Sequence, residues 1–492
     1  MTPPPRPMRT VTRILLPLAL GLLAGCNLAP KYSPPSVETP GQFREAAAPA
    51  TSDGGVTWNA AQPGDEASRG RWWEIYGDPQ LNALEAQVEI SNQNLASAAA
   101  GFRAARAAAA SVRSAFFPRI AVAPSYTRTR ASQTLKGGTT PASITDEYSL
   151  PVTASYEIDL WGRVRNTVAA SAAATQASAA DLATARLSIQ AALAENYFQL
   201  RAIDTERQII NETVASYRES LNQTSALYRA GIDSEEDVAR AQTQLNTTIA
   251  QATDLGVARA TLEHAIAVLV GRAPAGFTLA SAPLMAHAPV PPAGLPSNLL
   301  ERRPDIAAAE RRAAAANAQI GLARSAYFPS LTLGLSGGWA SGEFSRWFDS
   351  PSRFWSLGPQ FAELLFDGGA RRAQTEQSRA EFDQAAANYR QTVLGAFQSV
   401  EDNLAALRIL AQEAQEQQIA VASSQHLLDL ANTRFQTGID SYLNVITAQT
   451  ALLSNREAEV QIRLRQITAS ISLLKALGGG WSTAQLPSLK VD

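Results

Sequence analysis

One seven-residue turn occurs twice in this chain, and it constrains the fold more than any other feature. The first copy is YRAGIDS at residues 228–234, and the second is FQTGIDS at residues 435–441, 207 positions later (438 − 231). Gly231 and Gly438 stand where a helix would end in the left-handed region, and a serine three residues later can cap the next helix. Each copy lies between two long runs with almost no proline. The turn therefore predicts a hairpin of long helices, and its repetition predicts two hairpins built on one plan.

Each repeat is predicted to run through the same series of helices. The first helix ends before a proline, which disfavours the helical state of the residue before it. The second helix is about 100 Å long at 1.5 Å per residue, and the third returns to half that height. The six helices are expected at about 79–116, 162–229, 234–270, 298–327, 369–436 and 441–477. The chain is divided accordingly into repeat 1 at 71–271, a Pro-rich connector at 272–296, repeat 2 at 297–478 and a tail at 479–492.

Between the first helix and the long helix of each repeat, the hydrophobic period changes from 3.6 to 2. Strands are predicted at about 119–130, 148–160, 330–340 and 354–366. Each is about ten residues long, the length that crosses a bilayer when a strand is tilted. One face is aliphatic and aromatic, whereas the other carries small neutral polar residues. This contrast favours membrane strands with a wet interior over the alternative, a pair of soluble hairpins packed on helices.

Four strands are too few to close a membrane barrel, for which eight is the usual minimum. Open sheet edges are not tolerated in lipid, because each unpaired backbone group costs several kcal/mol there. The chain is therefore expected to pool its strands with identical copies. A homotrimer would supply a 12-stranded β-barrel above a long barrel of α-helices, so the fold class is mainly α with a membrane β-barrel portion.

The N-terminal residues 1–25 are predicted to be an export signal. Arginines precede an apolar run at 14–24, which is too short to span a bilayer as a stable helix. The run ends in LAGC, which resembles a bacterial lipobox, so Cys26 is expected to become a lipidated first residue; a plain signal with a buried cysteine is the alternative. By resemblance to lipoprotein sorting in Gram-negative bacteria, Asn27 at the next position implies the outer membrane. Residues 26–70 are expected to form an extended linker.

Composition excludes several classes of function. With 42 basic and 44 acidic residues the chain is nearly neutral, so no nucleic-acid partner is predicted. Its three histidines are scattered without ligand spacing, and Cys26 is its single cysteine, so neither a metal site nor a disulfide framework is expected. No acid–base pair or nucleophile stands in a pocket-like setting, which makes an enzyme the weakest interpretation.

The motifs taken together resemble the TolC-type outer-membrane efflux factors, in the lipoprotein branch that serves tripartite drug exporters of the RND type. The motifs that carry the resemblance, besides the two turns, are WWEIYGDPQL at 72–81, LLERRPDI at 299–306, SAYFP at 325–329, FDGG at 366–369 and AFQSVEDNL at 396–404. The resemblance implies a trimeric duct through the outer membrane and periplasm. It also implies two partners, a periplasmic adaptor and an inner-membrane pump, and no cofactor other than the lipid on Cys26.

The resemblance places the functional residues at the helix tips. Adaptor contact is expected at Gly231, Ile232, Gly438 and Ile439. The family narrows its closed entrance with acidic side chains one turn apart, and the matching positions here are Asn444 and Thr447. This departure puts cation binding at the constriction in doubt. Polar contacts among three other residues and their neighbours are instead predicted to hold the closed state: Asp237, Phe435 and Asp440.

Three other interpretations fit part of the pattern. A type I protein secretion duct would share the fold, although the lipobox and the 299–306 motif favour small-molecule efflux. A passive porin would rarely need the long helices, and a coiled-coil tether would not need the alternating strands. The resemblance implies that the pump, and not the duct, selects the exported compounds.

Overall fold

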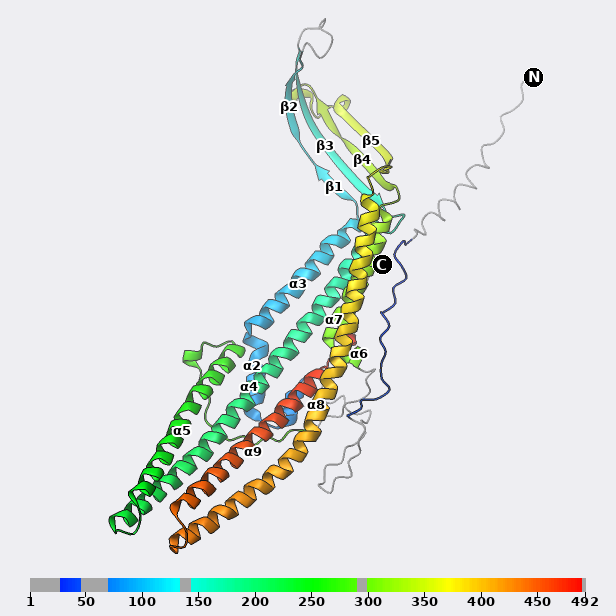
Figure 1. The fold of residues 1–492 in the computed structure, drawn as a ribbon. Helices are drawn as coiled ribbons and strands as arrows, with labels where there is room; N and C mark the ends of the chain where they lie inside the picture. Colours follow the sequence, from blue (N-terminus) through cyan, green and yellow to red (C-terminus); the bar gives the residue numbers. More distant parts are fainter. Residues whose placement is uncertain (1–26, 46–69, 133–142, 290–298, 489–492) are drawn as a thin grey trace, which may run out of the picture.

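The computed structural model describes residues 27–45, 70–132, 143–289 and 299–488. The signal segment and Cys26 lie outside the described residues, as do parts of the linker, of the connector and of the tail. The molecule is elongated, with a β-sheet at one end and two helical hairpins reaching away from it (Figure 1). Both helical tips lie at the end opposite the sheet. None of the described helices is long and apolar enough to cross a membrane.

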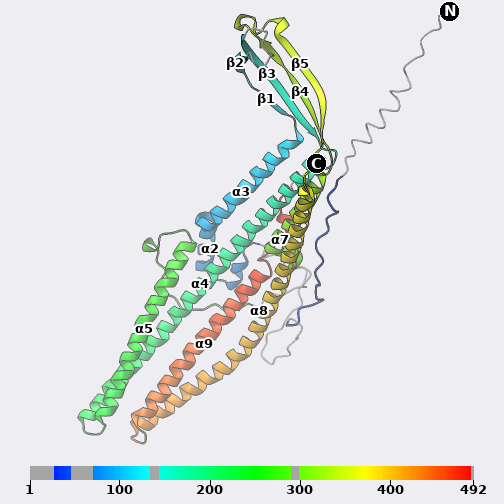
Figure 2. The same cartoon turned by 45° about the horizontal axis from the view of Figure 1, so that its top comes forward.

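Two helices of 67 residues each, α4 (Arg163–Arg229) and α8 (Ala370–Gln436), extend from the base of the sheet to the tips. At 1.5 Å per residue, each is about 100 Å long. The shorter helices pack beside them and are α2 (Pro79–Ser91), α3 (Gln93–Arg113), α5 (Glu235–Leu269), α6 (Leu299–Arg302), α7 (Pro304–Ser325) and α9 (Tyr442–Ala476). Near the sheet the neighbours run α3, α4, α7, α8, and near the tips they run α5, α4, α9, α8. A single curved layer of helices results (Figure 2).

The first helix of each repeat is broken in two, which corrects the continuous helices expected at 79–116 and 298–327. In repeat 1 the break is at Asn92, whose side chain accepts a hydrogen bond from the Leu95 amide and donates one to the Leu269 carbonyl at 2.7 Å. In repeat 2 it is at Arg303, before a proline. Each break faces the glycine that ends a return helix. A Cβ on Gly271 would lie 2.1 Å from the Ser91 carbonyl, and one on Gly478 would lie 2.1 Å from that of Arg302.

The sheet has five strands: β1 (Arg119–Val122), β2 (Ser125–Arg130), β3 (Ile144–Ile158), β4 (Ser330–Ser341) and β5 (Arg353–Ala362). All pairings are antiparallel. β1 and β2 both pair with β3, β3 pairs with β4 across the two repeats, and β4 pairs with β5. The strand expected at 119–130 is interrupted near Pro124, which has no N–H to donate. The second strand begins at 144 instead of 148, and β5 ends at 362 instead of 366.

The register places the apolar residues of all the strands on one face. Residues directly opposite each other in antiparallel strands lie on the same face. Ile120 is opposite Ala154, Tyr156 is opposite Leu333, and Leu331 is opposite Phe361. The alternation predicted from the sequence therefore extends through the whole sheet. Many of these apolar side chains are exposed, Ile120 at 71% and Phe361 at 68%, so the sheet presents an apolar surface in the isolated chain.

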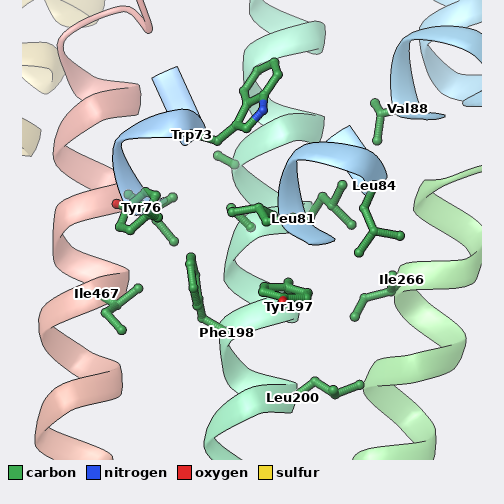
Figure 3. Packing of buried hydrophobic residues seen from close by; sticks show 14 of the residues in the cluster. Trp73, Tyr76, Leu81, Leu84, Val88, Tyr197, Phe198, Leu200, Ile266 and Ile467 are labelled. Atoms are coloured by element: carbon green, nitrogen blue, oxygen red, sulfur yellow. The ribbon is translucent and has the colours of Figure 1, made fainter. Parts of the chain in front are cut away.

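The main core lies at mid-height, where α2 and the segment before it pack on α4, α5 and α9 (Figure 3). Trp72 and Trp73 are each 3% exposed and belong to this core, so they anchor the segment before α2 on the helices. Tyr76 and Phe198 have ring centroids 5.1 Å apart, and Phe198 in turn packs edge-on against Tyr197. This cluster joins both repeats, because α9 contributes residues such as Ile467.

A buried ion network fixes the connector to this core. Asp204 on α4 lies 3.2 Å from Arg201 and 2.7 Å from Arg259 of α5. Both arginines also donate to connector carbonyls, Arg201 to Ala280 and Arg259 to Leu279. Burying these charges is tolerated because each is paired and hydrogen-bonded. The connector therefore follows a defined path over the helices up to residue 289, where the described part ends.

The linker begins at the base of the sheet and runs down the helices. A Cβ on Gly162, at the sheet–helix junction, would lie 3.4 Å from the Asn27 Cα. The Asn317 side chain then donates to the Pro30 carbonyl at 2.9 Å, and the Tyr32 hydroxyl donates to Glu310 at 2.6 Å. Further down, backbone amides of residues 44 and 45 donate to Glu401. The described linker, 27–45, is thus extended along α7 and α8.

Candidate functional site

The two turns at the tips have the same backbone hydrogen bonds. At the first turn the Ile232 amide donates to the Leu227 carbonyl and the Gly231 amide to that of Tyr228, each at 2.9 Å. At the second turn the Ile439 and Gly438 amides make the equivalent bonds, again at 2.9 Å. This is the Schellman arrangement, which requires a left-handed residue after the helix. The glycines supply it, with φ of 76° at the first turn and 71° at the second.

The isoleucine after each glycine is exposed to solvent. Ile232 is 74% exposed and Ile439 is 65% exposed, although both are large and apolar. The Schellman turn fixes the direction of these side chains, because both flanking amides are hydrogen-bonded. Both isoleucines are therefore exposed apolar side chains at the helical tips. The tips lie at the end of the molecule that is farthest from the sheet (Figure 1).

The first tip is closed by a reciprocal cap at the start of α5. The Ser234 Oγ accepts from the Asp237 amide at 3.1 Å and donates to the Asp237 carboxylate at 2.7 Å. Asp233 lies just before this cap. Partial burial, together with the nearby Asp237 carboxylate, raises the pKa of Asp233. The first tip thus holds two acidic side chains in mutual repulsion.

The second tip replaces this repulsion with an ion pair. The Arg434 Nε lies 2.6 Å from one carboxylate oxygen of Asp440, and its Nη2 lies 3.4 Å from the other. The guanidinium lowers the pKa of Asp440, and the Asn444 amide adds to this effect. Sequence reasoning did not single out Arg434. The sequence does contain a signal for Arg434. It is a basic residue in the last turn of a helix, and an acidic residue follows it six positions later, across the tight turn.

An aromatic contact connects the end of α8 to the start of α9. The Phe435 and Tyr442 rings have centroids 5.4 Å apart, and Tyr442 is 2% exposed. Tyr442 and Val445 form a small core with Ala241 of α5, so this core joins the two tips. Burial is the main cause of the raised pKa of Tyr442, and the Asp237 charge contributes to it.

Asn444 and Thr447 lie one turn apart on the exposed side of α9. The Thr447 hydroxyl donates to the Leu443 carbonyl at 2.9 Å, within its own helix. Neither side chain belongs to the core between the tips. The structure therefore brings Phe435 onto Tyr442, Asp440 onto Arg434 and Asp237 onto Ser234. Asn444 and Thr447 are exposed on α9, Asn444 beside Asp440, and their role at a constriction stays a prediction.

Polar side chains hold α9 against α4 above the tips. The Gln449 amide donates to the Ser220 hydroxyl at 3.2 Å, and the Gln461 amide donates to Glu206. Gln449 is only 4% exposed. The joint between the two hairpins therefore combines these side-chain hydrogen bonds with the small apolar core around Tyr442.

No group of three or more His, Cys, Asp or Glu side chains suited to hold a metal ion occurs among the residues that the structure describes. The helical tips carry exposed apolar side chains, capped turns and ion pairs. These features suit contact with another protein.

Comparisons with known proteins agree with this geometry. The family model described as outer membrane efflux protein matches residues 84–272 and 295–479, one segment in each repeat. The chain is 32% identical to the "Probable efflux pump outer membrane protein TtgC" of Pseudomonas putida over 96% of both chains. It is 34% identical to the "Solvent efflux pump outer membrane protein SrpC" of the same species, over 95% of this chain and 98% of that protein. Among solved structures, the outer-membrane channel OprN superposes with a TM-score of 0.85 at 30% identity, covering 93% of this chain and all of that one.

Proposed function

This chain belongs to the outer membrane efflux protein family, and from that premise we propose that three copies form one continuous duct from the periplasm to the outside of the cell. Its general function is that of an outer-membrane channel in an efflux system, and it is not an enzyme.

One observation supports the proposed homotrimer: the sheet has two open edges and one apolar face. β2 pairs only with β3, and β5 pairs only with β4. In lipid, unpaired edges must be satisfied, and closure into a barrel is the general solution. The layer of helices below the sheet also has two open edges, with α3 and α5 at one edge and α8 at the other. Three copies would close both layers at once.

We propose that a periplasmic adaptor binds the tips and connects the duct to an inner-membrane pump of the RND type. The exposed Ile232 and Ile439 support this contact, because rigid apolar points at the end of a helical hairpin suit a helical partner. A type I protein secretion duct is the second candidate, since it would use the same fold. The named efflux relatives favour small molecules over proteins as cargo.

We also propose that Cys26 carries lipid. Asn27 lies against the sheet–helix junction at Gly162. Adjacent Cα atoms are about 3.8 Å apart, so acyl chains on residue 26 would reach the inner leaflet beside the barrel. Mass spectrometry of the mature protein tests this directly. A Cys26→Ser variant is expected to lose the acyl mass, and an unmodified wild-type N-terminus would refute the anchor.

Single-channel conductance of the purified protein in a planar bilayer tests the duct. A low conductance that rises when the tip contacts are removed is expected, alongside chemical crosslinking that captures three copies in native membranes. A large, steady conductance that does not change when the tip contacts are removed would favour a porin. Crosslinking that yields only monomer would refute the trimer.

A further inference from the structure

Six aromatic rings form a continuous cluster at the end of the sheet farthest from the helices. Tyr126 stacks on Tyr148 with centroids 4.7 Å apart, and Tyr148 lies 5.8 Å from Trp347. Trp347 stacks in turn on Phe348 at 5.0 Å. The cluster consists of Tyr126, Tyr148, Trp339, Phe344, Trp347 and Phe348. Three of the rings belong to the β4–β5 connection, which therefore folds onto the apolar face of the sheet.

Three arginines lie on this same face, two of them beyond Tyr126 and one level with Trp339. Side chains two positions apart on a strand share a face, so Arg128 and Arg130 follow Tyr126. Arg353 is directly opposite Trp339 in the register. Arg128 lies 3.7 Å from Asp146. Within the described part of the chain, neither Arg130 nor Arg353 makes an ion pair, and both side chains are exposed.

The proposed barrel would bring these arginines together, and the inference therefore rests on the proposed function. β2 and β5 are the open edges, and they run in opposite directions. Closure between copies would pair β5 of one copy with β2 of the next. The start of β5 and the end of β2 lie at the same outer end, so Arg353 of one copy would stand near Arg128 and Arg130 of its neighbour. Arg128 is already paired with Asp146, but Arg130 and Arg353 are unpaired like charges on a surface that faces lipid, and they repel each other unless an anion lies between them.

We propose that this seam binds the phosphorylated headgroup of an anionic glycolipid from the outer leaflet of the outer membrane. The guanidinium of arginine matches phosphate oxygens in bidentate geometry. The adjoining aromatic cluster supplies the amphipathic rings that favour the depth of lipid headgroups. Acyl chains would lie against the apolar strands and the rings at the interface, with Arg353 level with Trp339 and Arg128 and Arg130 farther out.

The main alternative is that the arginines extend from the edge of the membrane into water without binding any particular lipid. Binding of bisphosphorylated lipid A to the full-length protein, followed by native mass spectrometry, separates the two. The double variant Arg130→Gln/Arg353→Gln leaves the Arg128–Asp146 pair intact. It is expected to weaken binding by about tenfold or more, because two charge-assisted hydrogen bonds to phosphate can no longer form. Arg119→Gln is the matched control, because Arg119 lies on β1 at the opposite end of the sheet and pairs with Ser155 on the other face.

The probe itself is varied as well. Dephosphorylated lipid A is expected to bind the wild type as weakly as the intact lipid binds the double variant, whereas Arg130→Lys/Arg353→Lys should retain part of the affinity. The proposal is overturned if the double variant binds like the wild type, if the phosphate groups make no difference, or if inorganic phosphate alone occupies the site as tightly as the lipid. Protein that forms trimers and conducts, but shows no lipid preference, would refute this inference alone. Protein that never forms trimers would refute the proposed function.

Discussion

Arg434 binds Asp440 across the second helical tip, with its Nε 2.6 Å from a carboxylate oxygen. The first tip has an aspartate at the equivalent position, Asp233, but the position equivalent to Arg434 is Leu227 (434 − 207). The same backbone turn therefore holds a stabilised carboxylate in one repeat and a destabilised one in the other. The two tips are distinct electrostatically although their hydrogen-bonded turns match.

The tips should respond to pH in opposite directions. Asp233 has a raised pKa in the fold, so the stability it contributes is present at low pH and is lost as pH rises through its folded pKa. Asp440 has a lowered pKa, so its contribution is present near neutrality and is lost as pH falls through its folded pKa. The local stability of the two turns is measured by hydrogen exchange of the Ile232 and Ile439 amides, corrected for intrinsic rates. Acidification from neutrality should protect Ile232 first and expose Ile439 only at lower pH. Equal responses at both tips would contradict the assignment, and Asp233→Asn should abolish the response of the first.

Removing the ion pair should loosen the second tip. The Arg434→Leu variant loses an exposed ion pair at the tip. Because exposed ion pairs are weak, the fraction of open channels is expected to rise by only about two- to fivefold. Single-channel conductance measures the change. Leu227→Arg is the reciprocal variant and should pair with Asp233, making the first tip insensitive to pH. Unchanged conductance in Arg434→Leu would remove Arg434 and Asp440 from the gate.

The tip glycines should not tolerate a side chain. Gly231→Ala or Gly438→Ala forces a left-handed residue with a Cβ, at a cost of about 1–2 kcal/mol in local stability. Faster amide exchange at the altered tip and weaker adaptor binding are expected. Gly256→Ala is the control, because Gly256 lies inside α5 with no atom within 4 Å of the added Cβ. That change should instead stabilise by about 1 kcal/mol. Similar effects in all three variants would show that the turn geometry is not the cause.

Glu85 should destabilise the mid-height core at neutral pH. It is fully buried on α2, both of its carboxylate oxygens lack hydrogen-bond partners, and burial, with a contribution from Glu89, raises its pKa to about 9. Stability linked to this group is therefore present below the unfolded value of 4.5 and falls as pH rises toward 9. Glu85→Gln should raise the free energy of unfolding by up to about 3 kcal/mol at pH 7 and by under about 1 kcal/mol at pH 5.

Thermal unfolding followed by circular dichroism at both pH values checks the Glu85 prediction. Glu74→Gln is the control, since Glu74 is exposed and lies 3.1 Å from Arg71. An effect of Glu85→Gln that does not change with pH would show that ionisation is not what limits stability here.

Acidic side chains at exposed positions 444 and 447 of α9 should create a cation site. In a trimer, Asn444→Asp/Thr447→Asp would place two carboxylates per copy around the entrance, and divalent cations should then reduce conductance. The wild type is expected to respond little, because neither side chain carries charge. Addition of Mg²⁺ during conductance recordings measures the difference. An equally strong effect on both proteins would place the cation site elsewhere in the duct.

Features that depend on neighbouring residues could be predicted from the sequence. The repeated glycine turn, the long helices that flank it and the alternation of the strands all follow from local backbone preferences and periodicity. The long helices begin at Arg163 and Ala370, one residue from where the pattern placed them. The family resemblance rested on the same local motifs and was confirmed.

Features that depend on residues far apart in the chain became visible only in the folded molecule. The break at Asn92 exists because that residue meets the end of α5, which lies in a distant part of the chain, and the pairing of β3 with β4 joins the two repeats. The linker path along α7 and α8 was likewise not visible in its composition. At the tips, the shared GIDS sequence has opposite electrostatics because Arg434 and Asn444 act on Asp440, whereas Leu227 and Asp237 occupy the equivalent positions beside Asp233. Local sequence sets the backbone angles φ and ψ and the hydrophobic period. Long-range packing determines which side chains come into contact, and the chemistry of each tip depends on those contacts.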